Sequence, residues 1–528
     1  MQNVHPIGID LGTTNSAVAY VAASGRTEML RNSRNEVLTP SVVLFDQDAI
    51  VVGAEARKAC AFRLAEVAAY AKREMGKEFY SRPVAGHQLP PEVIQAYVLK
   101  QLRQDIEDRL TGPYEVVITV PAFFDAGRRQ KTLDAGELAG LQVLDIVNEP
   151  TAAALAFGEQ LGYVSPAGAP SAEMNLLVYD LGGGTFDVTV IHLAPHGIRT
   201  LATDGDVLLG GCDWDRRLVD YVSQKFEDRY RLDPRNDPNA TARLVQLCED
   251  AKHTLSVRRQ ATVLATHAGR QLAVDISRET FQDLTADLVE RTLYTSRQVL
   301  AAANLTWNDI HRVLLVGGST RMPMIADHLR EESAIEPDNS MNPDEAVARG
   351  AAIFATERLR TKGVTTPDLC LNVVDVNSHS LGVAGINQMT GRRENTILIP
   401  KNQPLPAHVS QQFVTKHDNQ QSIVIKVLEG ESSDPAACIV VGKAVLRNLP
   451  PGLRKGHPIE VAYEYATDGR LTVRGRVVHT NHQVMVEFQR DGRMGDRRFR
   501  DWRQVVQRAD TLGQMVSMLA HVVTRDNG

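Results

Sequence analysis

The chain has 528 residues, of which 43% are hydrophobic and 23% charged, and its formal net charge is −6. This length suits about three domains, and the ordinary apolar fraction excludes global disorder. The mildly acidic balance disfavours a uniformly basic surface of the kind that coats nucleic acid.

Signals for metal binding, secretion and membrane insertion are weak. The five cysteines lie far apart without a CxxC pair, which indicates isolated thiols rather than a zinc site or a disulfide framework. Asp10 interrupts the first apolar run, and no stretch of about 18 apolar residues follows. We therefore expect a cytoplasmic protein without a membrane span.

The first third of the chain alternates strand-like and helix-like segments. Strands are expected at 7–9 and 16–23 around a Gly/Thr turn, and then at 42–45, 50–52, 115–120 and 143–147. Helices are expected over 54–75, 91–111, 126–140 and 150–161. Residues 163–172 are rich in Pro, Gly, Ser and Ala, which is typical of a linker.

The second third repeats this pattern. The phrase Ile-Asp-Leu-Gly-Thr-Thr at 9–14 returns as Tyr-Asp-Leu-Gly-Gly-Gly-Thr at 179–185, again between two expected strands. Helices at 211–231, 240–257 and 278–304 and strands within 261–276 and 313–316 follow. This internal duplication predicts two similar lobes that face one another across a cleft.

The composition changes after residue 361. Runs of alternating, β-branched residues at 421–428, 439–446, 459–465 and 471–478 predict an all-β domain. An arginine-rich stretch, 490–508, overlaps the one helix expected at the end of the chain, about 499–523. A solvated face is the ordinary interpretation of that stretch, and contact with an acidic partner or RNA is the alternative.

The glycine turns after Asp10 and Asp180 indicate a phosphate-binding site. Glycine lets backbone N–H groups approach phosphate oxygens, and a carboxylate beside a phosphate implies a Mg²⁺ ion between them. Two matching turns on two lobes make ordinary β-turns a poor explanation. A third turn, at Gly317, Gly318 and Ser319, suits the α-phosphate or ribose side of a nucleotide. No Walker A loop occurs, and the first two turns lead into strands rather than a Rossmann helix.

Six motifs in order resemble the signatures of the 70-kDa heat-shock chaperone family, the DnaK-like proteins. They lie at 7–16, 120–124, 148–154, 180–187, 316–321 and 342–348. The resemblance, over about residues 5–480, implies an α/β fold class. It consists of a duplicated actin-like (ribonuclease H-like) two-lobed ATPase domain, an all-β sandwich that binds peptides, and a short C-terminal helix. The implied limits are 1–360 (lobes 1–165 and 173–360), a linker at 361–372, a sandwich at 373–480 and a vestigial lid at 481–528.

The resemblance also assigns residues to ATP hydrolysis. Asp10 and Asp180 would organise hydrated Mg²⁺ with Asp187 near the metal, while Lys72, Glu149 and Thr185 would orient the attacking water. The remaining phosphate-side positions are Gly12, Thr13, Thr14, Asn15, Gly182, Gly183 and Gly184. The adenosine-side positions are Glu249, Lys252, His253, Ser256, Gly317, Gly318, Ser319, Arg321 and Asp344. His253 stands where the family commonly has an arginine that stacks on adenine. Without the resemblance, a solvated helix lysine would be the ordinary interpretation of Lys72.

In the sandwich, the resemblance places a peptide channel at Val383, Phe413, Ile423, Ile425 and Ile459. The pattern alone favours a closed hydrophobic core, and the resemblance reverses that preference. The sequence departs from the family in two places. The first lobe is shortened between Lys72 and Pro121, and most of the helical lid is lost. Loss of the lid would speed peptide release.

The expected function is an ATP-dependent chaperone, mainly monomeric, that hydrolyses ATP and binds exposed apolar peptides. ATP/ADP and Mg²⁺ are the implied cofactors, with K⁺ as a further candidate, and a J-domain cochaperone is the implied partner. An exchange factor is left open, and nucleic acid is not expected. A nucleotide-gated scaffold for one dedicated partner and a small-molecule kinase on the same fold are the alternatives.

Overall fold

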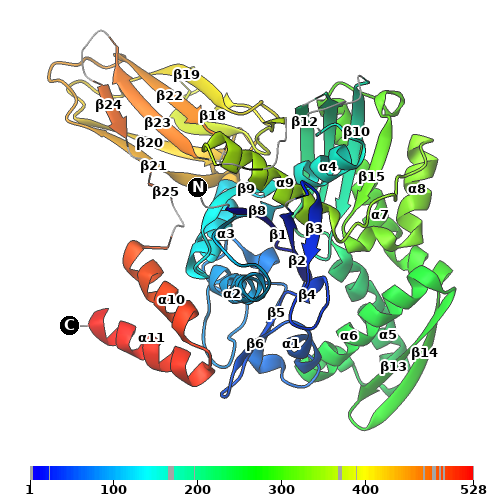
Figure 1. The fold of residues 1–528 in the computed structure, drawn as a ribbon. Helices are drawn as coiled ribbons and strands as arrows, with labels where there is room; N and C mark the ends of the chain where they lie inside the picture. Colours follow the sequence, from blue (N-terminus) through cyan, green and yellow to red (C-terminus); the bar gives the residue numbers. More distant parts are fainter. Residues whose placement is uncertain are drawn as a thin grey trace.

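The computed structural model describes residues 4–22, 24–164, 172–195, 197–364, 366, 371–387, 389–467, 470–478, 483–486, 489–490 and 494–526. Two sheet-based lobes lie side by side, a β-sandwich covers one end of them, and two C-terminal helices lie against the first lobe (Figure 1).

The first lobe is built on a mixed sheet of order β3-β2-β1-β8-β9, with β4 paired to β2. The central strand β1 runs antiparallel to β2 and parallel to β8. A smaller sheet has the order β6-β5-β7. The strands are β1 His5–Asp10, β2 Asn15–Val21, β3 Thr27–Leu30, β4 Leu38–Pro40, β5 Val42–Phe45, β6 Ile50–Val52, β7 Val67–Ala69, β8 Tyr114–Val120 and β9 Val143–Asn148. The helices are α1 Ala54–Ala59, α2 Pro91–Arg109, α3 Ala126–Leu138 and α4 Glu149–Gln160.

The long helix expected over 54–75 is wrong beyond its first turns. Helix α1 ends at Ala59, and Val67–Ala69 instead forms β7, which pairs with β5. Short 3₁₀ turns, Leu64–Glu66 and Ala71–Glu74, flank this strand. The partner strand is more than twenty residues away in the sequence, so local periodicity favoured a helix that tertiary pairing replaces.

The second lobe repeats the hairpin of the first. Its sheet has the order β15-β10-β11-β12-β16, with β10 antiparallel to β11 and parallel to β15. The strands are β10 Met174–Leu181, β11 Phe186–Ala194, β12 Gly197–Asp206, β13 Gln260–His267, β14 Arg270–Ser277, β15 Arg312–Val316 and β16 Asn372–Val374. The helices are α5 Gly211–Tyr230, α6 Pro238–Val257, α7 Arg278–Ala302, α8 Pro323–Ser333 and α9 Ala346–Thr361. The duplication predicted from the sequence is therefore a structural repeat.

The two lobes meet through α4 and α9. A Cβ atom on Gly350 of α9 would lie only 1.6 Å from the carbonyl oxygen of Ala152 in α4, so the two backbones touch. On another side of α9, a Cβ on Gly8 of β1 would lie 2.2 Å from the Ala352 nitrogen. These close approaches lock both sheets to one helix pair and fix the hairpins of the two lobes opposite one another.

The β-sandwich consists of two sheets, of order β18-β17-β20-β21-β25 and β19-β22-β23-β24. The strands are β17 Leu381–Ile386, β18 Arg393–Ile399, β19 Ala407–Val414, β20 Ser422–Glu429, β21 Ile439–Arg447, β22 Pro458–Tyr465, β23 Leu471–Val477, β24 Gln483–Val486 and β25 Gln489–Arg490. Buried aliphatic side chains and Tyr463 fill the space between the sheets. The predicted all-β segment is thus a sandwich, and residues 468–469 within it lie outside the described part of the chain.

The sandwich touches the lobes mainly through polar side chains. Three of these contacts are Asp375 with Asn148 at 2.6 Å, Lys401 with Asp204 at 2.8 Å and the Asn402 side chain with the Thr203 N–H at 3.0 Å. Before the sandwich, β16 runs parallel to β12 as the edge strand of the second lobe. The expected linker residues 368–370 lie outside the described part of the chain.

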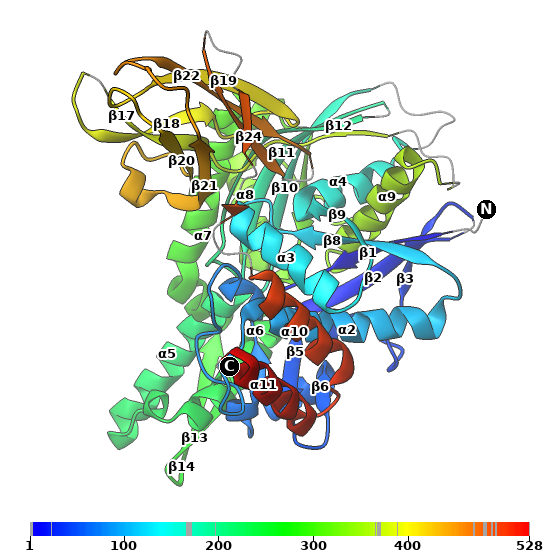
Figure 2. The ribbon, with the colours of Figure 1, turned by 90° about the vertical axis from the view of Figure 1, so that its left-hand side faces the viewer.

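The C-terminal segment differs from the single helix that was expected. It forms α10 (Asp496–Arg508) and α11 (Leu512–Asp526), separated by residues 509–511. Both helices lie against the first lobe, where α10 contacts α2 and α3 (Figure 2), and neither covers the sandwich. The sequence could not reveal this because the helix faces meet a surface some 400 residues earlier in the chain.

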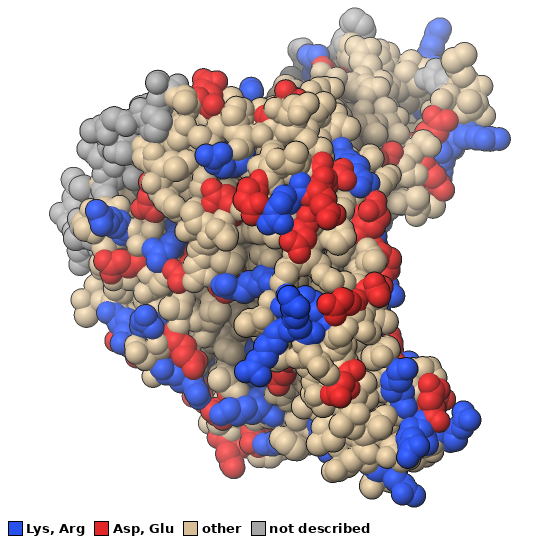
Figure 3. All heavy atoms as spheres, turned by 90° about the vertical axis from the view of Figure 1, so that its right-hand side faces the viewer, with Lys and Arg blue, Asp and Glu red and all other residues tan. Residues whose placement is uncertain are grey.

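Two surface properties bear on the expectations above. Along the described residues, no helix combines the length and apolar character required to cross a membrane. On the face shown in Figure 3, Lys and Arg side chains are interspersed with Asp and Glu rather than gathered into one field of a single sign.

Candidate functional site

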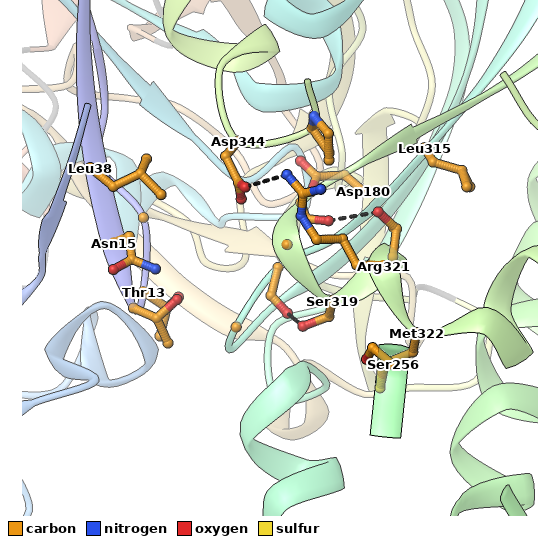
Figure 4. A pocket seen from close by; sticks show the side chains of 18 of the residues that line it. Thr13, Asn15, Leu38, Asp180, Ser256, Leu315, Ser319, Arg321, Met322 and Asp344 are labelled. Carbon is orange, nitrogen blue, oxygen red and sulfur yellow. Dashed lines mark hydrogen bonds and ion pairs between the residues drawn. The ribbon is translucent and has the colours of Figure 1, made fainter. Parts of the chain in front are cut away.

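A cavity of about 1110 Å³ opens between the two lobes (Figure 4). The β1–β2 and β10–β11 hairpins reach it from opposite sides, and α6 and the turn after β15 close it. Of the sequence-predicted nucleotide residues, these line it: Asp10, Gly12, Thr13, Thr14, Asn15, Lys72, Glu149, Asp180, Gly182, Gly183, Thr185, Glu249, Lys252, His253, Ser256, Gly317, Gly318, Ser319, Arg321 and Asp344. Only Gly184 and Asp187 lie behind its wall.

The two glycine turns face one another across the cavity. A Cβ on Gly183 would lie 2.4 Å from the Thr14 side chain, and one on Gly184 would lie 2.5 Å from Thr13. Glycine is therefore required for the threonines of one lobe to reach the turn of the other. The result is a narrow passage bordered by backbone N–H groups and hydroxyls, which suits a chain of phosphates.

Buried carboxylates gather beside this passage. Burial, and then the charge of Glu149, raises the pKa of Asp10 to about 7, although Thr119 donates a hydrogen bond to it at 3.2 Å. The pKa of Asp180 is also raised, first by burial and then by Glu149. Behind them, Asp187 accepts a hydrogen bond from the Phe123 N–H at 3.0 Å, and burial raises its pKa to about 7.

This crowding of carboxylates suits a cation. A divalent ion beside them would offset their mutual repulsion and favour their charged forms. Within the described residues, no three Asp, Glu, His or Cys side chains converge closely enough to hold an ion directly. Mg²⁺ at Asp10 and Asp180 would therefore be held through water and phosphate oxygens.

Lys72 brings a cationic side chain to these carboxylates. Its Nζ lies 2.5 Å from Glu149 Oε1, and both side chains are buried. The lysine follows Tyr70, whose left-handed backbone (φ 58°) turns the chain from β7 into the 3₁₀ segment. Glu149 begins α4, so two elements of the first lobe hold a buried ion pair at the end of the phosphate passage.

The opposite end of the cavity is formed by the second lobe. Ser319 donates a hydrogen bond to the Gly182 carbonyl at 2.8 Å, which ties the third turn to the second. Arg321 pairs with Asp344 at 2.6 Å across the cavity wall, as Figure 4 shows. Gly317 has a φ of 81°, and a Cβ there would lie 2.4 Å from the Leu181 carbonyl oxygen.

The face of α6 that was predicted to bind adenosine also lines the cavity. Lys252 bonds Asp215 at 2.8 Å and the Gly211 carbonyl at 3.1 Å, while Ser256 bonds back to the Lys252 carbonyl. Burial lowers the pKa of His253, which therefore presents a neutral ring. Lys252 and Ser256 consequently hold internal partners that a nucleotide would have to share.

Sequence reasoning missed three residues around this cavity, two of which join the lobes. Arg57 of α1 pairs with Glu249 of α6 at 2.7 Å. Arg73 of the first lobe bonds the Leu208 carbonyl at 2.6 Å and Asp213 at 3.3 Å in the second. Asp215 holds Lys252. None belongs to a glycine motif, and their partners are more than 30 residues away, so no local pattern could have found them.

The predicted peptide residues divide into two groups. Val383, Ile425 and Ile459 are 4% exposed or less and belong to the core of the sandwich. Phe413 and Ile423 are only partly buried at the edge of that core. Three of the five positions therefore fill the interior in this structure, and the other two offer apolar surface to a ligand.

Comparison with known proteins places this architecture. The family model described as "Hsp70 protein" matches residues 6–87 and 80–511. The chain is 38% identical over 475 residues to the chaperone protein DnaK of Halobacterium salinarum, covering 88% of this chain and 72% of the relative. It is 36% identical over 536 residues to DnaK of Thermotoga neapolitana (97% and 87%), and 37% identical over 489 residues to DnaK of Thermosipho melanesiensis (91% and 79%). The chain belongs to the Hsp70 family of ATP-hydrolysing molecular chaperones, and it is shorter than these relatives.

Proposed function

We propose that this chain is an ATP-dependent chaperone in which residues 1–360 bind and hydrolyse ATP and residues 373–480 bind extended apolar peptides. The observation that carries the proposal is the cavity between the lobes. In it, Asp10, Lys72, Glu149 and Asp180 converge beside two glycine turns. The polar interface between lobes and sandwich supports communication between the two sites.

The phosphates of ATP are assigned to the passage between Thr13, Thr14 and the turn at Gly182–Gly184. Mg²⁺, where bound, would neutralise phosphate charge and orient the terminal phosphoryl group. Lys72 offsets charge that develops on the γ-phosphoryl oxygens, and Glu149 fixes the lysine and orients the attacking water with Thr185. Hydrolysis then proceeds by in-line attack, for which positioning and electrostatics supply most of the acceleration.

Adenosine is assigned to the wall formed by α6 and the turn after β15. The neutral ring of His253 can stack on adenine, and Lys252 and Ser256 can share their hydrogen bonds with ribose. The Arg57–Glu249 pair closes over this end, so it ties nucleotide release to separation of the lobes.

Coupling to peptide runs through the second lobe. The nucleotide turn at Gly182–Gly184 begins β11, which pairs with β12, and β12 pairs with β16 just before the sandwich. A displacement of the turn is thereby transmitted to the junction of the domains. Because coupling of two binding sites is reciprocal, peptide must change nucleotide affinity as much as nucleotide changes peptide affinity.

The expected partners follow from these sites. Phe413 and Ile423 would contact an extended apolar peptide, which can also bond an exposed strand edge. A J-domain cochaperone, K⁺ as an auxiliary ion, a cytoplasmic location and a mainly monomeric state complete the proposal.

The test is ATP hydrolysis with and without an extended apolar heptapeptide. We expect the peptide to stimulate turnover in the native chain. Lys72→Ala should abolish hydrolysis while ATP still binds, whereas Lys58→Ala, on an exposed lysine of α1, should change neither. Normal turnover of the Lys72 variant would refute the assignment of the site.

A further inference from the structure

The C-terminal helices are part of the hydrophobic core of the first lobe. Val506 and Met515 are 0% exposed, and Trp502 is 7% exposed. They belong to the same buried cluster as the β1 and β8 side chains at the centre of the lobe. Around these buried residues, Phe499, Val516, Met518 and Leu519 of the same helices pack against the cluster while partly buried.

Helix α2 shows the same relation from the other side. Every residue from 91 to 99 is buried, a run of more than two helical turns. A helix that is buried all round needs cover on every face, and α10 supplies part of that cover, with α3 and β5 supplying other parts. Removal of α10 would therefore expose the part of α2 that it covers.

Backbone hydrogen bonds also join the helices to the lobe. The Ile50 N–H donates to the Asp510 carbonyl at 2.7 Å, and the Leu512 N–H donates to the Asp46 carbonyl at 2.9 Å. Lys100 of α2 bonds Asp510 at 2.8 Å. The two main-chain bonds hold the break between α10 and α11 against the β5–β6 turn.

The sandwich provides a contrast within the same molecule. Its contacts with the lobes are mainly polar, and Ala126 is the one buried apolar residue of the lobes in its core cluster, within the described residues. Interfaces that open and close between domains are typically polar, whereas permanent interfaces resemble a core. By this criterion the sandwich contact is reversible and the α10–α11 contact is not.

We propose that α10 and α11 are a permanent structural part of the first lobe and cover no peptide in any nucleotide state. The peptide surface of the sandwich is then left open by the helices in both the ATP and the ADP form. The helices thus add a layer to the first lobe and do not act as a lid. This inference concerns the position of the helices and stands apart from the chaperone assignment.

Hydrogen exchange on the native chain tests this directly. With ATP, and again with ADP plus an apolar heptapeptide, amides of α10 should exchange as slowly as those of α2. The α10 exchange rates in these two states should agree within about twofold. A detachable lid predicts that ADP plus peptide raises α10 exchange at least tenfold while α2 stays protected. That result would overturn the proposal.

A matched pair of variants supplies a second test. Val506→Asp places a charge in the shared core, so we expect faster exchange in α2 and a lower melting temperature of the first lobe. Gln504→Asp changes an exposed position of the same helix and should do neither. If Val506→Asp frees α10 while α2 exchange and the melting temperature remain native, the helices are not part of the lobe.

Discussion

We predict that Glu429 makes the contact between sandwich and lobes sensitive to pH. This side chain lies at the end of β20, is 5% exposed, and accepts hydrogen bonds from the Ala126 N–H at the start of α3, at 3.1 and 3.3 Å. Burial, and then the charge of Asp125, raises the pKa of Glu429 from 4.5 to about 8, while Arg129 acts weakly in the opposite direction and Glu431 reinforces the rise. The docked form therefore holds a proton that an undocked, solvated carboxyl would release.

The sign and size of the effect follow from that difference. A raised pKa in the docked state means that the contribution to docking is complete below pH 4.5 and is lost as the pH rises through about 8. The full difference corresponds to about 5 kcal/mol, and to a change in the docking equilibrium of about fivefold between pH 7 and pH 8. His379, a half-buried imidazole at this interface, has a pKa lowered from 6.5 by burial and acts in the opposite sense below that pH, so the assay is confined to the window above pH 7.

The assay is energy transfer between bioorthogonal labels at the exposed positions Asp48 and Lys455, one on the first lobe and one on the sandwich. It is run at an ATP concentration that populates both forms. The docked fraction should fall from pH 7 to pH 8 in the native chain and stay constant in Glu429→Gln, which cannot ionise. Glu464→Gln, on a partly exposed carboxylate elsewhere in the sandwich, is the control. The reasoning would be refuted if docking of the native chain did not depend on pH, or if Glu429→Gln kept the pH dependence of the native chain.

Three further predictions concern the lobes and the sandwich. Arg57→Ala removes a partly exposed ion pair worth roughly 0.5–1 kcal/mol, so ADP release measured by stopped flow should be about two- to fivefold faster; an unchanged rate would mean that the pair does not restrain the cleft. Gly350→Ala places a methyl group against the Ala152 carbonyl and should cost about 3 kcal/mol or more by denaturant unfolding, whereas Gly495→Ala, with open space around it, should be nearly neutral; equal stabilities would contradict the close approach of α4 and α9. Ile423→Asp should lose heptapeptide binding measured by fluorescence anisotropy while basal ATPase is retained, and its neighbour Val424→Asp, 57% exposed on the other face of β20, should bind normally; loss in both variants would point to general damage.

The sequence was most informative where function and local structure coincide. The turns at Gly12 and Gly182 could be predicted because each needs a short motif between two strands, and both line the cavity. Alternation in β20 and β22 likewise identified the sandwich. It could not decide whether Ile425 faces a ligand or a core, since both demand the same apolar residue, and in the structure it lies in the core.

Long-range partners could not be predicted. Val67–Ala69 forms a strand because it pairs with β5. Arg57 pairs with a glutamate of the other lobe. Trp502 packs into the core of a lobe that begins at the other end of the chain. In each case one half of the contact carries no motif. Single-sequence patterns report periodicity and turn chemistry, whereas these features depend on tertiary proximity.

The short strand β16 gives the second lobe a removable edge. Three residues, Asn372–Val374, occupy the open side of β12 through backbone pairing, which does not depend on the identity of the side chains. When the sandwich departs and takes this strand with it, the start of β12 is left with unpaired N–H and C=O groups, ready to accept any extended segment. Undocking would therefore leave an unpaired edge on β12, for which β16 would compete with extended segments of other molecules. Because only three residues pair there, such an edge would offer few backbone hydrogen bonds to a neighbouring molecule.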